Sequence, residues 1–254
     1  MDRQSSAFGE TLDCEPGREG YGGDVMGTAA TILTRAGVLL FDDEHIRWPL
    51  AELADWLDEG VKSIIKVKPG AHTEQIVLPL ARGTSQKVPQ DARVVQLIDI
   101  LCNEPNEDGG GGRAIRSTAR SSLDASEPSW HDPSYVPYRR QVRQYVYDST
   151  LPFDFYVYPG NDGTGRVRAV ASTLPPTVSG QVEAGSTNIA AYEIPHGLPE
   201  QYDDVLLDYV LYRANLKDDT AAQPARATLH YQAFSASLGY QAQTEAAAPS
   251  GGGR

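Results

Sequence analysis

The sequence contains few of the residues and motifs from which reactive sites are built. Its 254 residues include two cysteines, Cys14 and Cys102, and neither has a partner at metal-ligand spacing. Two cysteines so far apart do not predict a disulfide framework, and a reducing compartment is the default. Phosphate-binding loops, the nucleophile elbow and the H-E-x-x-H and C-x-x-C motifs are also absent. We therefore expect no catalytic residues, no cofactor and no metal site, and hence no enzyme.

Basic residues and long apolar runs are scarce as well. The formal net charge is −12, from 22 basic and 34 acidic residues. A protein that grips nucleic acid through phosphates needs a basic surface, so tight DNA binding is not expected, although DNA passing by an acidic wall is compatible with this charge. No run approaches the roughly 20 apolar residues of a membrane helix, so no membrane partner is expected. The composition fits an ordinary acidic protein better than it fits a protein with an acidic wall for DNA, so composition alone leaves the function open.

Two helical patterns near the C-terminus are the most informative part of the sequence. Apolar side chains at 205–211 leave almost no polar face, which predicts a helix buried on most sides. After a short polar turn, residues 227–238 place apolar side chains on one narrow helical stripe. Pro224 predicts the start of this helix and Gly239 its end.

Two further helical patterns lie near the N-terminus. Asp24 is a favourable N-cap residue, and residues 29–40 then place their apolar side chains on one face. Pro49 opens the second pattern, whose apolar stripe at 53–65 faces away from a row of charged residues and ends before a Pro-Gly pair. These helices and the two C-terminal ones have matching apolar stripes, so we expect them to pack as one four-helix unit.

The middle of the chain changes to strand patterns. Short β-branched or aromatic segments separated by turn residues predict strands at 76–80, 93–102, 142–148, 153–159 and 167–173. The segment GNDGTG at 160–165 predicts a hairpin turn. Helices at both ends around a β-rich insertion predict an α+β fold.

The expected organisation has five parts. They are an extended N-terminal arm at 1–23, a first helical part at 24–70, a β-rich insertion at 71–200, a second helical part at 201–239 and a C-terminal tail at 240–254. Neither the arm nor the tail has a periodic apolar face, so neither should fold alone.

Two polar clusters suggest chemistry at first sight. DDEH at 42–45 brings three carboxylates and an imidazole together, but its place between two helices favours turn and capping roles over metal binding. His131 lies between Trp130 and Asp132, and adjacent residues rarely face each other usefully. Packing of Trp130, with His131 in a turn, is therefore favoured.

Several separated segments resemble one family in their order and spacing. They are RWPLAELADWLDEGVKSIIKVKP at 47–69, LPLARGTSQKVPQDARVVQLIDI at 78–100, GRAIRSTARSSLDASEPSWHDP at 112–133, VRQYVYDSTLPFDFYVYP at 142–159 and the C-terminal helical pair. Together they are similar to the bacteriophage head–tail adaptor, or connector, proteins of the tail tubular protein A-like family. The resemblance covers about residues 24–239.

This resemblance implies a structural virion protein at the head–tail junction, made in the host cytoplasm. Such adaptors form a homo-oligomeric ring, commonly a dodecamer, beneath the portal protein. The ring gives the tail or nozzle protein a docking surface and extends the channel through which double-stranded DNA passes without tight binding. A tail terminator or stopper ring is an alternative, and a tail-associated hydrolase that uses His131 is a less favoured one.

The site residues that we expect are contact residues rather than catalysts. In the family that this sequence resembles, the C-terminal segment reaches the portal, which implies a portal contact through Tyr240 and Arg254. Polar, Gly-rich loops are easily reshaped on contact, so we predict that two of them face the tail. The residues concerned are Gly109, Gly110, Asn161 and Asp162.

Overall fold

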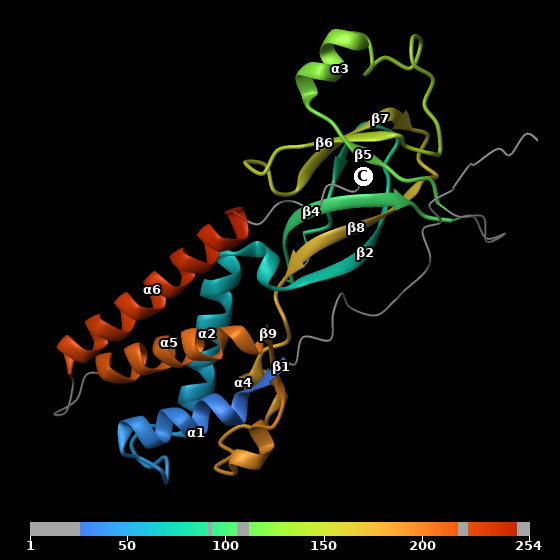
Figure 1. Cartoon of the computed structure of the whole chain (residues 1–254). Helices are drawn as coiled ribbons and strands as arrows, with labels where there is room; N and C mark the ends of the chain where they lie inside the picture. The colour runs from blue at the N-terminus through green and yellow to red at the C-terminus, as the bar shows by residue number, and fades with distance from the viewer. Residues whose placement is uncertain (1–25, 91–92, 106–111, 218–222, 248–254) are drawn as a thin grey trace, which may run out of the picture. The chain divides into compact units, whose positions relative to one another are not determined.

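In the computed structural model, residues 26–90, 93–105, 112–217 and 223–247 are described, and they adopt a mixed helix-and-strand fold (Figure 1). The α+β prediction is thereby confirmed at this level. The described residues group into two compact units. The helical unit takes its residues from 26–73 and 172–247, and the β-rich unit takes its residues from 74–171. Residues 172–200, which the sequence analysis placed with the insertion, thus belong to the helical unit.

Four helices make up most of the helical unit. They are α1 (Ala29–Leu40), α2 (Leu50–Val67), α5 (Asp203–Leu216) and α6 (Pro224–Ala247). Helix α5 packs against each of the other three, which explains why its sequence has almost no polar face. Figure 1 shows α5 and α6 side by side. Gly60 of α2 allows a close approach to α5, because a Cβ at Gly60 would lie only 3.1 Å from the Tyr209 ring.

Two helix ends differ from the prediction. Helix α1 begins at Ala29 after the N-cap Thr28, because residues 26–28 pair as a strand instead; Asp24, the expected N-cap, lies outside the described residues. Helix α6 continues through Gly239 to Ala247. A glycine costs a helix only about 1 kcal/mol, and the residues that follow are mostly good helix formers. Tyr240 therefore lies within α6 rather than in a separate tail.

A small sheet completes the helical unit and contains a buried histidine. Strand β1 (Met26–Thr28) pairs antiparallel with β9 (Pro195–Pro199). His196 is buried; its Nε2 lies 2.9 Å from Asp203 Oδ1, and its Nδ1 accepts from the backbone N–H of Leu198 at 3.3 Å. Because Leu198 N–H can only donate, the neutral ring carries its proton on Nε2 and donates it to Asp203. Burial lowers the pKa of His196, and Asp203 opposes the shift only in part.

We expect the free energy of unfolding to fall as the pH drops below about 6.5, the ordinary pKa of histidine. Because the pKa of His196 is lowered in the folded protein, the unfolded chain takes up the proton first. The stability that neutral His196 contributes is fully present above its pKa in the unfolded chain. This contribution is therefore lost as the pH falls towards the lower pKa of His196 in the folded protein. One group contributes a slope of at most about 1.4 kcal/mol per pH unit.

Urea titrations across this pH range check the expectation. His196→Gln should flatten the slope, whereas His131→Gln should flatten it less, because burial and Arg120 lower the pKa of His131 from a partly exposed position. Equal slopes for the wild type and His196→Gln would contradict this account.

A buried carboxylate of α2 fixes the chain that follows the β-rich unit. Asp58 is 6% exposed. Its Oδ1 accepts from Val178 N–H at 2.7 Å, and its Oδ2 accepts from the N–H and the hydroxyl of Ser179 at 3.0 and 2.7 Å. Val178 and Ser179 begin α4 (Val178–Gln181), so Asp58 acts as an N-cap supplied from a distant part of the sequence. Short 3-10 turns η1 (Pro69–Ala71), η2 (Ile189–Tyr192) and η3 (Glu200–Tyr202) complete the unit.

Asp58→Ala should lower the free energy of unfolding by roughly 2–4 kcal/mol, because two N–H groups and a hydroxyl lose a charged acceptor. Asp58→Asn keeps one acceptor oxygen and should cost less. Asp55→Ala is the matched control, since Asp55 is exposed on the same helix. Chemical denaturation measures all three, and an Asp58→Ala protein as stable as the control would exclude this capping role.

The β-rich unit holds two sheets around a common apolar core. One sheet has the order β2 (Thr73–Pro79), β8 (Arg166–Thr173), β4 (Val94–Asn103). The other has the order β3 (Gly83–Lys87), β7 (Asp154–Asn161), β6 (Gln144–Tyr147), β5 (Arg116–Ser117). Residues from both sheets, including Leu97, Phe155 and Val167, form the core. Helix α3 (Arg120–Ser126) precedes Trp130, which is buried against Leu123 and Val146.

Two details of this unit correct the sequence analysis. Strands β7 and β8 belong to different sheets, so GNDGTG connects two sheets and is not a hairpin turn. Cys102 on β4 is buried and disulfide-bonded, which the wide spacing of the two cysteines did not predict.

Candidate docking surface

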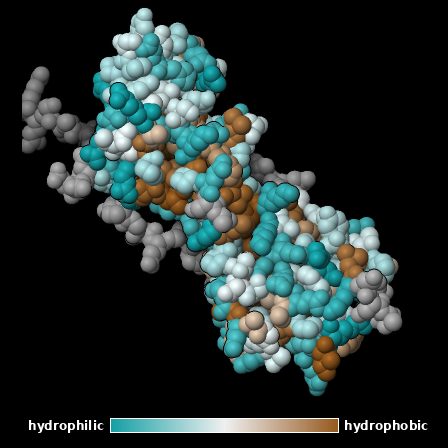
Figure 2. Space-filling model, turned by 180° about the vertical axis from the view of Figure 1, so that it is seen from behind, coloured by the Kyte–Doolittle hydropathy of each residue, from teal (hydrophilic) through white to brown (hydrophobic). Residues whose placement is uncertain are grey.

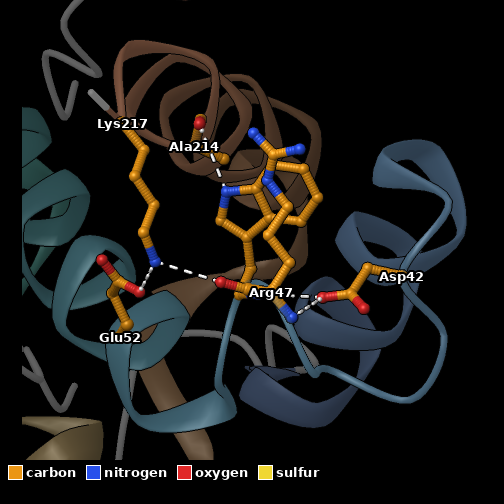
Figure 3. Close-up of polar contacts among 6 residues, drawn as sticks. Asp42, Arg47, Glu52, Ala214 and Lys217 are labelled. Atoms are coloured by element: carbon orange, nitrogen blue, oxygen red, sulfur yellow. Dashed lines mark hydrogen bonds and ion pairs between the residues drawn. The ribbon is translucent and has the colours of Figure 1, made fainter. Parts of the chain in front are cut away.

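The connection between α1 and α2 is a turn organised by one aspartate. Asp42 Oδ1 accepts from Ile46 N–H at 3.1 Å. Its Oδ2 accepts from the N–H groups of Arg47 and Trp48 at 3.0 and 2.8 Å, and Figure 3 shows Asp42 beside Arg47. Gly37 leaves room for the turn, since a Cβ there would lie 2.8 Å from the His45 ring. The acidic run at 42–45 therefore does the turn work that was predicted. Within the described part of the chain, no group of three or more His, Cys, Asp or Glu residues can hold a metal ion.

Hydrogen bonds connect the end of this turn to α5 and α2. Trp48 Nε1–H donates to the carbonyl of Ala214 at 3.3 Å, and the Arg47 guanidinium lies 4.3 Å from the centre of the Trp48 ring. Lys217 Nζ donates to the carbonyl of Arg47 at 3.0 Å and to Glu52 Oε2 at 2.5 Å (Figure 3). The base of the turn is therefore held in place by neighbouring helices.

The outer part of the turn presents apolar side chains to solvent. Phe41 is 89% exposed and Ile46 is 76% exposed. Phe41 and His45 have φ angles of 57° and 52°, in the left-handed region that costs a residue other than glycine roughly 1–3 kcal/mol. Phe41 is the left-handed C-cap of α1, with its N–H directed at the carbonyls of Gly37 and Val38. Phe41 and Ile46 therefore project from the turn and bury little within the chain. We call residues 41–46 the docking turn.

An open cleft of about 620 Å³ lies beside the docking turn. Leu39, Leu40, Trp48 and Leu229 line its apolar part, and Leu229 is largely exposed. His230, also at the cleft, is hydrogen-bonded to Asp208 at 2.9 Å. Most of the surface in Figure 2 is hydrophilic, with separate hydrophobic patches. A rigid projection of large apolar side chains beside a cleft is typical of a protein-docking surface.

The structure describes the side chains of two predicted contact residues, Asn161 and Asp162, and only one of them is exposed. Asn161 is 0% exposed, so its prediction as a tail-facing residue is wrong. Its side chain instead bonds the carbonyls of Arg139 and Arg140 and the N–H groups of Gly163 and Gly165. Asp162 is exposed, and hydrogen bonds from Thr164 lower its pKa.

The other predicted contact residues are placed less fully. Tyr240 lies within α6, while Gly109, Gly110 and Arg254 lie outside the described residues.

His131 stacks on Trp130 with ring centres 3.7 Å apart, and its Nδ1 lies 2.7 Å from the Thr84 hydroxyl. The burial of Trp130 confirms its predicted packing role, whereas the stacking of His131 on its neighbour was not expected.

A family model described as SU10 adaptor protein matches residues 27–254. The chain belongs to the SU10 adaptor protein family. This is a bacteriophage family of structural virion proteins, and it implies partners at the head–tail junction. The resemblance to phage adaptors is confirmed at this level, while the narrower tail tubular protein A-like assignment stays a prediction. A search of curated proteins found no match.

For an SU10 adaptor protein, the relevant surfaces are those that contact other proteins. Among the described residues, no helix is long and apolar enough to cross a membrane. Sequence reasoning missed the docking turn because Phe41 and Ile46 looked like ordinary apolar residues at helix ends. The available signal was their position on either side of the acidic run DDEH.

Proposed function

We propose that this chain forms the head-to-tail adaptor ring, a dodecamer, that joins the portal protein to the tail or nozzle protein. The observation that carries the proposal is the SU10 adaptor family match, which spans both units of the chain. The docking turn supports it, because a structural adaptor acts through surfaces that bind protein. The four helices then act as one unit that carries the docking turn.

In this proposal the docking turn contacts the neighbouring copy in the ring. Phe41 and Ile46 are the anchors, since large apolar side chains near the centre of an interface carry most of its binding energy. Asp42 holds the turn before contact is made, which reduces the entropy lost on association.

The portal and tail contacts are assigned to other segments. Tyr240 and Arg254 are the proposed portal contacts, and they belong to the C-terminal end of the family match. The loops with Gly109, Gly110 and Asp162 are the proposed tail contacts. Double-stranded DNA passes through the ring without tight binding. In support, residues 22–73 and 172–254 carry nearly twice as many acidic as basic residues, and a net negative surface repels phosphate.

Two truncations test the portal contact. Removal of residues 248–254 leaves the described length of α6 intact and deletes Arg254, whereas removal of residues 240–254 also deletes Tyr240. We expect the shorter truncation to weaken binding to isolated portal rings and the longer one to abolish it, with ring formation unchanged in both. Pull-down with portal protein measures the first property and native mass spectrometry the second. Stable, DNA-filled particles assembled with the longer truncation would contradict the portal assignment.

A further inference from the structure

An exposed group of arginines lies on the β-rich unit and is not used by the contacts proposed above. We call it the arginine strip. All of its members are exposed: Arg113, Arg116, Arg139, Arg140, Arg143 and Arg166. Backbone contacts bring them together. The N–H of Arg116 donates to the carbonyl of Arg143 at 3.1 Å, where β5 runs parallel to β6.

Two buried asparagines fix the backbone beneath the strip. Asn103 Nδ2 donates to the carbonyls of Arg113 and Val142, at 2.9 and 2.8 Å, and its Oδ1 accepts from Val142 N–H. Asn161 Nδ2 donates to the carbonyls of Arg139 and Arg140, at 3.1 and 2.8 Å. These bonds use the backbone and leave the guanidinium groups free to face solvent. The backbone of Arg113, Arg139 and Arg140 is thus fixed from below, while Arg116 and Arg166 lie on β5 and β8.

The arginines of the strip differ from others in the same unit. Arg93, Arg120 and Arg168 form ion pairs with Glu74, Asp124 and Glu104 respectively. None of the six strip arginines forms an ion pair within the described residues, although Asp162 lies near enough to Arg140 to interact electrostatically. Exposed arginines that form no ion pair with the residues that the structure describes have the charge pattern of a binding surface for an anionic partner.

The anionic partner that the chain itself offers is its own helical unit. Residues 22–73 and 172–254 contain nearly twice as many acidic as basic residues. In residues 74–171, the numbers of acidic and basic residues are almost equal. Asp43 and Glu44 are exposed on the docking turn and form no ion pair with the residues that the structure describes. They stand between Phe41 and Ile46, so the turn combines acidic and apolar side chains on one rigid projection.

The composition of the strip favours a protein over DNA as the partner. Residues 74–171 contain ten arginines and one lysine, Lys87, and arginine is enriched at protein interfaces while lysine is depleted there. The loop before Arg139 adds Tyr135, an aromatic side chain that is 74% exposed and can contact Phe41 or Ile46. The net charge of −12 also repels a duplex as it approaches.

We infer that the arginine strip of one copy binds the docking turn of the next copy, with Asp43 and Glu44 facing the strip. This inference rests on the proposed ring and names the two surfaces that build it. The contact is heterologous, because the turn and the strip are different surfaces. Contacts of this kind form a ring when the rotation between successive copies closes, as the proposed dodecamer requires.

Complementary charge reversals test the inference on the full-length chain. Arg116→Glu with Arg143→Glu should weaken self-association at least about 100-fold, since close charge pairs at interfaces couple strongly. Asp43→Arg with Glu44→Arg should do the same. A mixture of the two variants should recover assembly, because alternating copies restore opposite charges at every contact. Lys87→Glu is the control for charge reversal in this unit, since Lys87 is an exposed cation on β3, outside the strip. Native mass spectrometry measures assembly, and circular dichroism measures folding.

Recovery in the mixture, with each variant folded but dissociated alone, is the expected result. Assembly of the strip variant at wild-type concentration would overturn the inference and leave the proposed ring standing. Unchanged assembly together with loss of a salt-sensitive affinity for duplex DNA would also overturn it, because the strip would then be a nucleic-acid site. A wild-type chain that stays monomeric would instead reject the proposed ring, and this inference with it.

Discussion

Replacement of Trp56 by alanine should lower the free energy of unfolding of the helical unit by about 3–5 kcal/mol, the usual cost of deleting a buried aromatic side chain. Trp56 is 9% exposed on α2, as the sequence stripe predicted. It lies one helical turn before Gly60, at which Leu206 and Tyr209 of α5 approach closely. The cavity left by the indole would therefore open beside the interface of α2 with α5.

Chemical denaturation of the full chain measures this effect. Lys62→Ala is the matched control, because Lys62 is exposed on the same helix and should change stability by less than about 0.5 kcal/mol. A Trp56→Ala protein that unfolds at the same denaturant concentration as the control would reject the packing of both ends of the chain into one helical core.

The second large effect concerns assembly rather than folding. Phe41→Asp combined with Ile46→Asp should weaken self-association at least about 100-fold, since two interface anchors each contribute roughly 2 kcal/mol or more. The fold should be retained, because both side chains are already exposed and Asp42 still organises the turn. Sedimentation velocity measures the association, and thermal unfolding of the variant monomer monitors the fold.

Leu151→Asp provides the control for this experiment. Leu151 is 54% exposed on a loop of the β-rich unit, so the change makes the same kind of apolar-to-aspartate replacement, once instead of twice, at an exposed position outside the docking turn. It should leave self-association unchanged. If the docking-turn variant assembles as well as Leu151→Asp, the turn does not lie between copies.

The helices were predictable because the buried face of a helix requires apolar residues at helical spacing in the sequence. The apolar residues of α5 cover nearly its whole circumference, and the structure shows why, since α5 contacts three other helices. The end of α6 was not predictable from Gly239 alone. Glycine stops a helix when a left-handed turn follows, and here the helical conformation simply continues.

The strands of the middle segment were predictable, but their arrangement was not. Strand β3 has the sequence GTSQK, which lacks the apolar alternation of a strand and forms because it pairs with β7. Similarly, β7 and β8 flank a turn sequence typical of a hairpin yet enter different sheets. Such choices depend on contacts between distant residues, including the amide groups of Asn103 and Asn161, which local sequence patterns do not encode.

The docking surface was predictable only in part. The turn role of Asp42 followed from its place between two helices, and the structure confirms it. The exposure of Phe41 did not follow, because an apolar residue at a helix end is usually buried. The arginine strip combines residues from several segments, and spacing along the sequence does not reveal that they meet.

The most direct test of the central claim is a cryo-electron microscopy reconstruction of the head–tail junction of assembled particles. The account predicts a dodecameric ring of this chain that contacts the portal protein on one side and the tail or nozzle protein on the other. A hexameric ring at the end of a tail tube, with no portal contact, would contradict the adaptor assignment and favour a terminator.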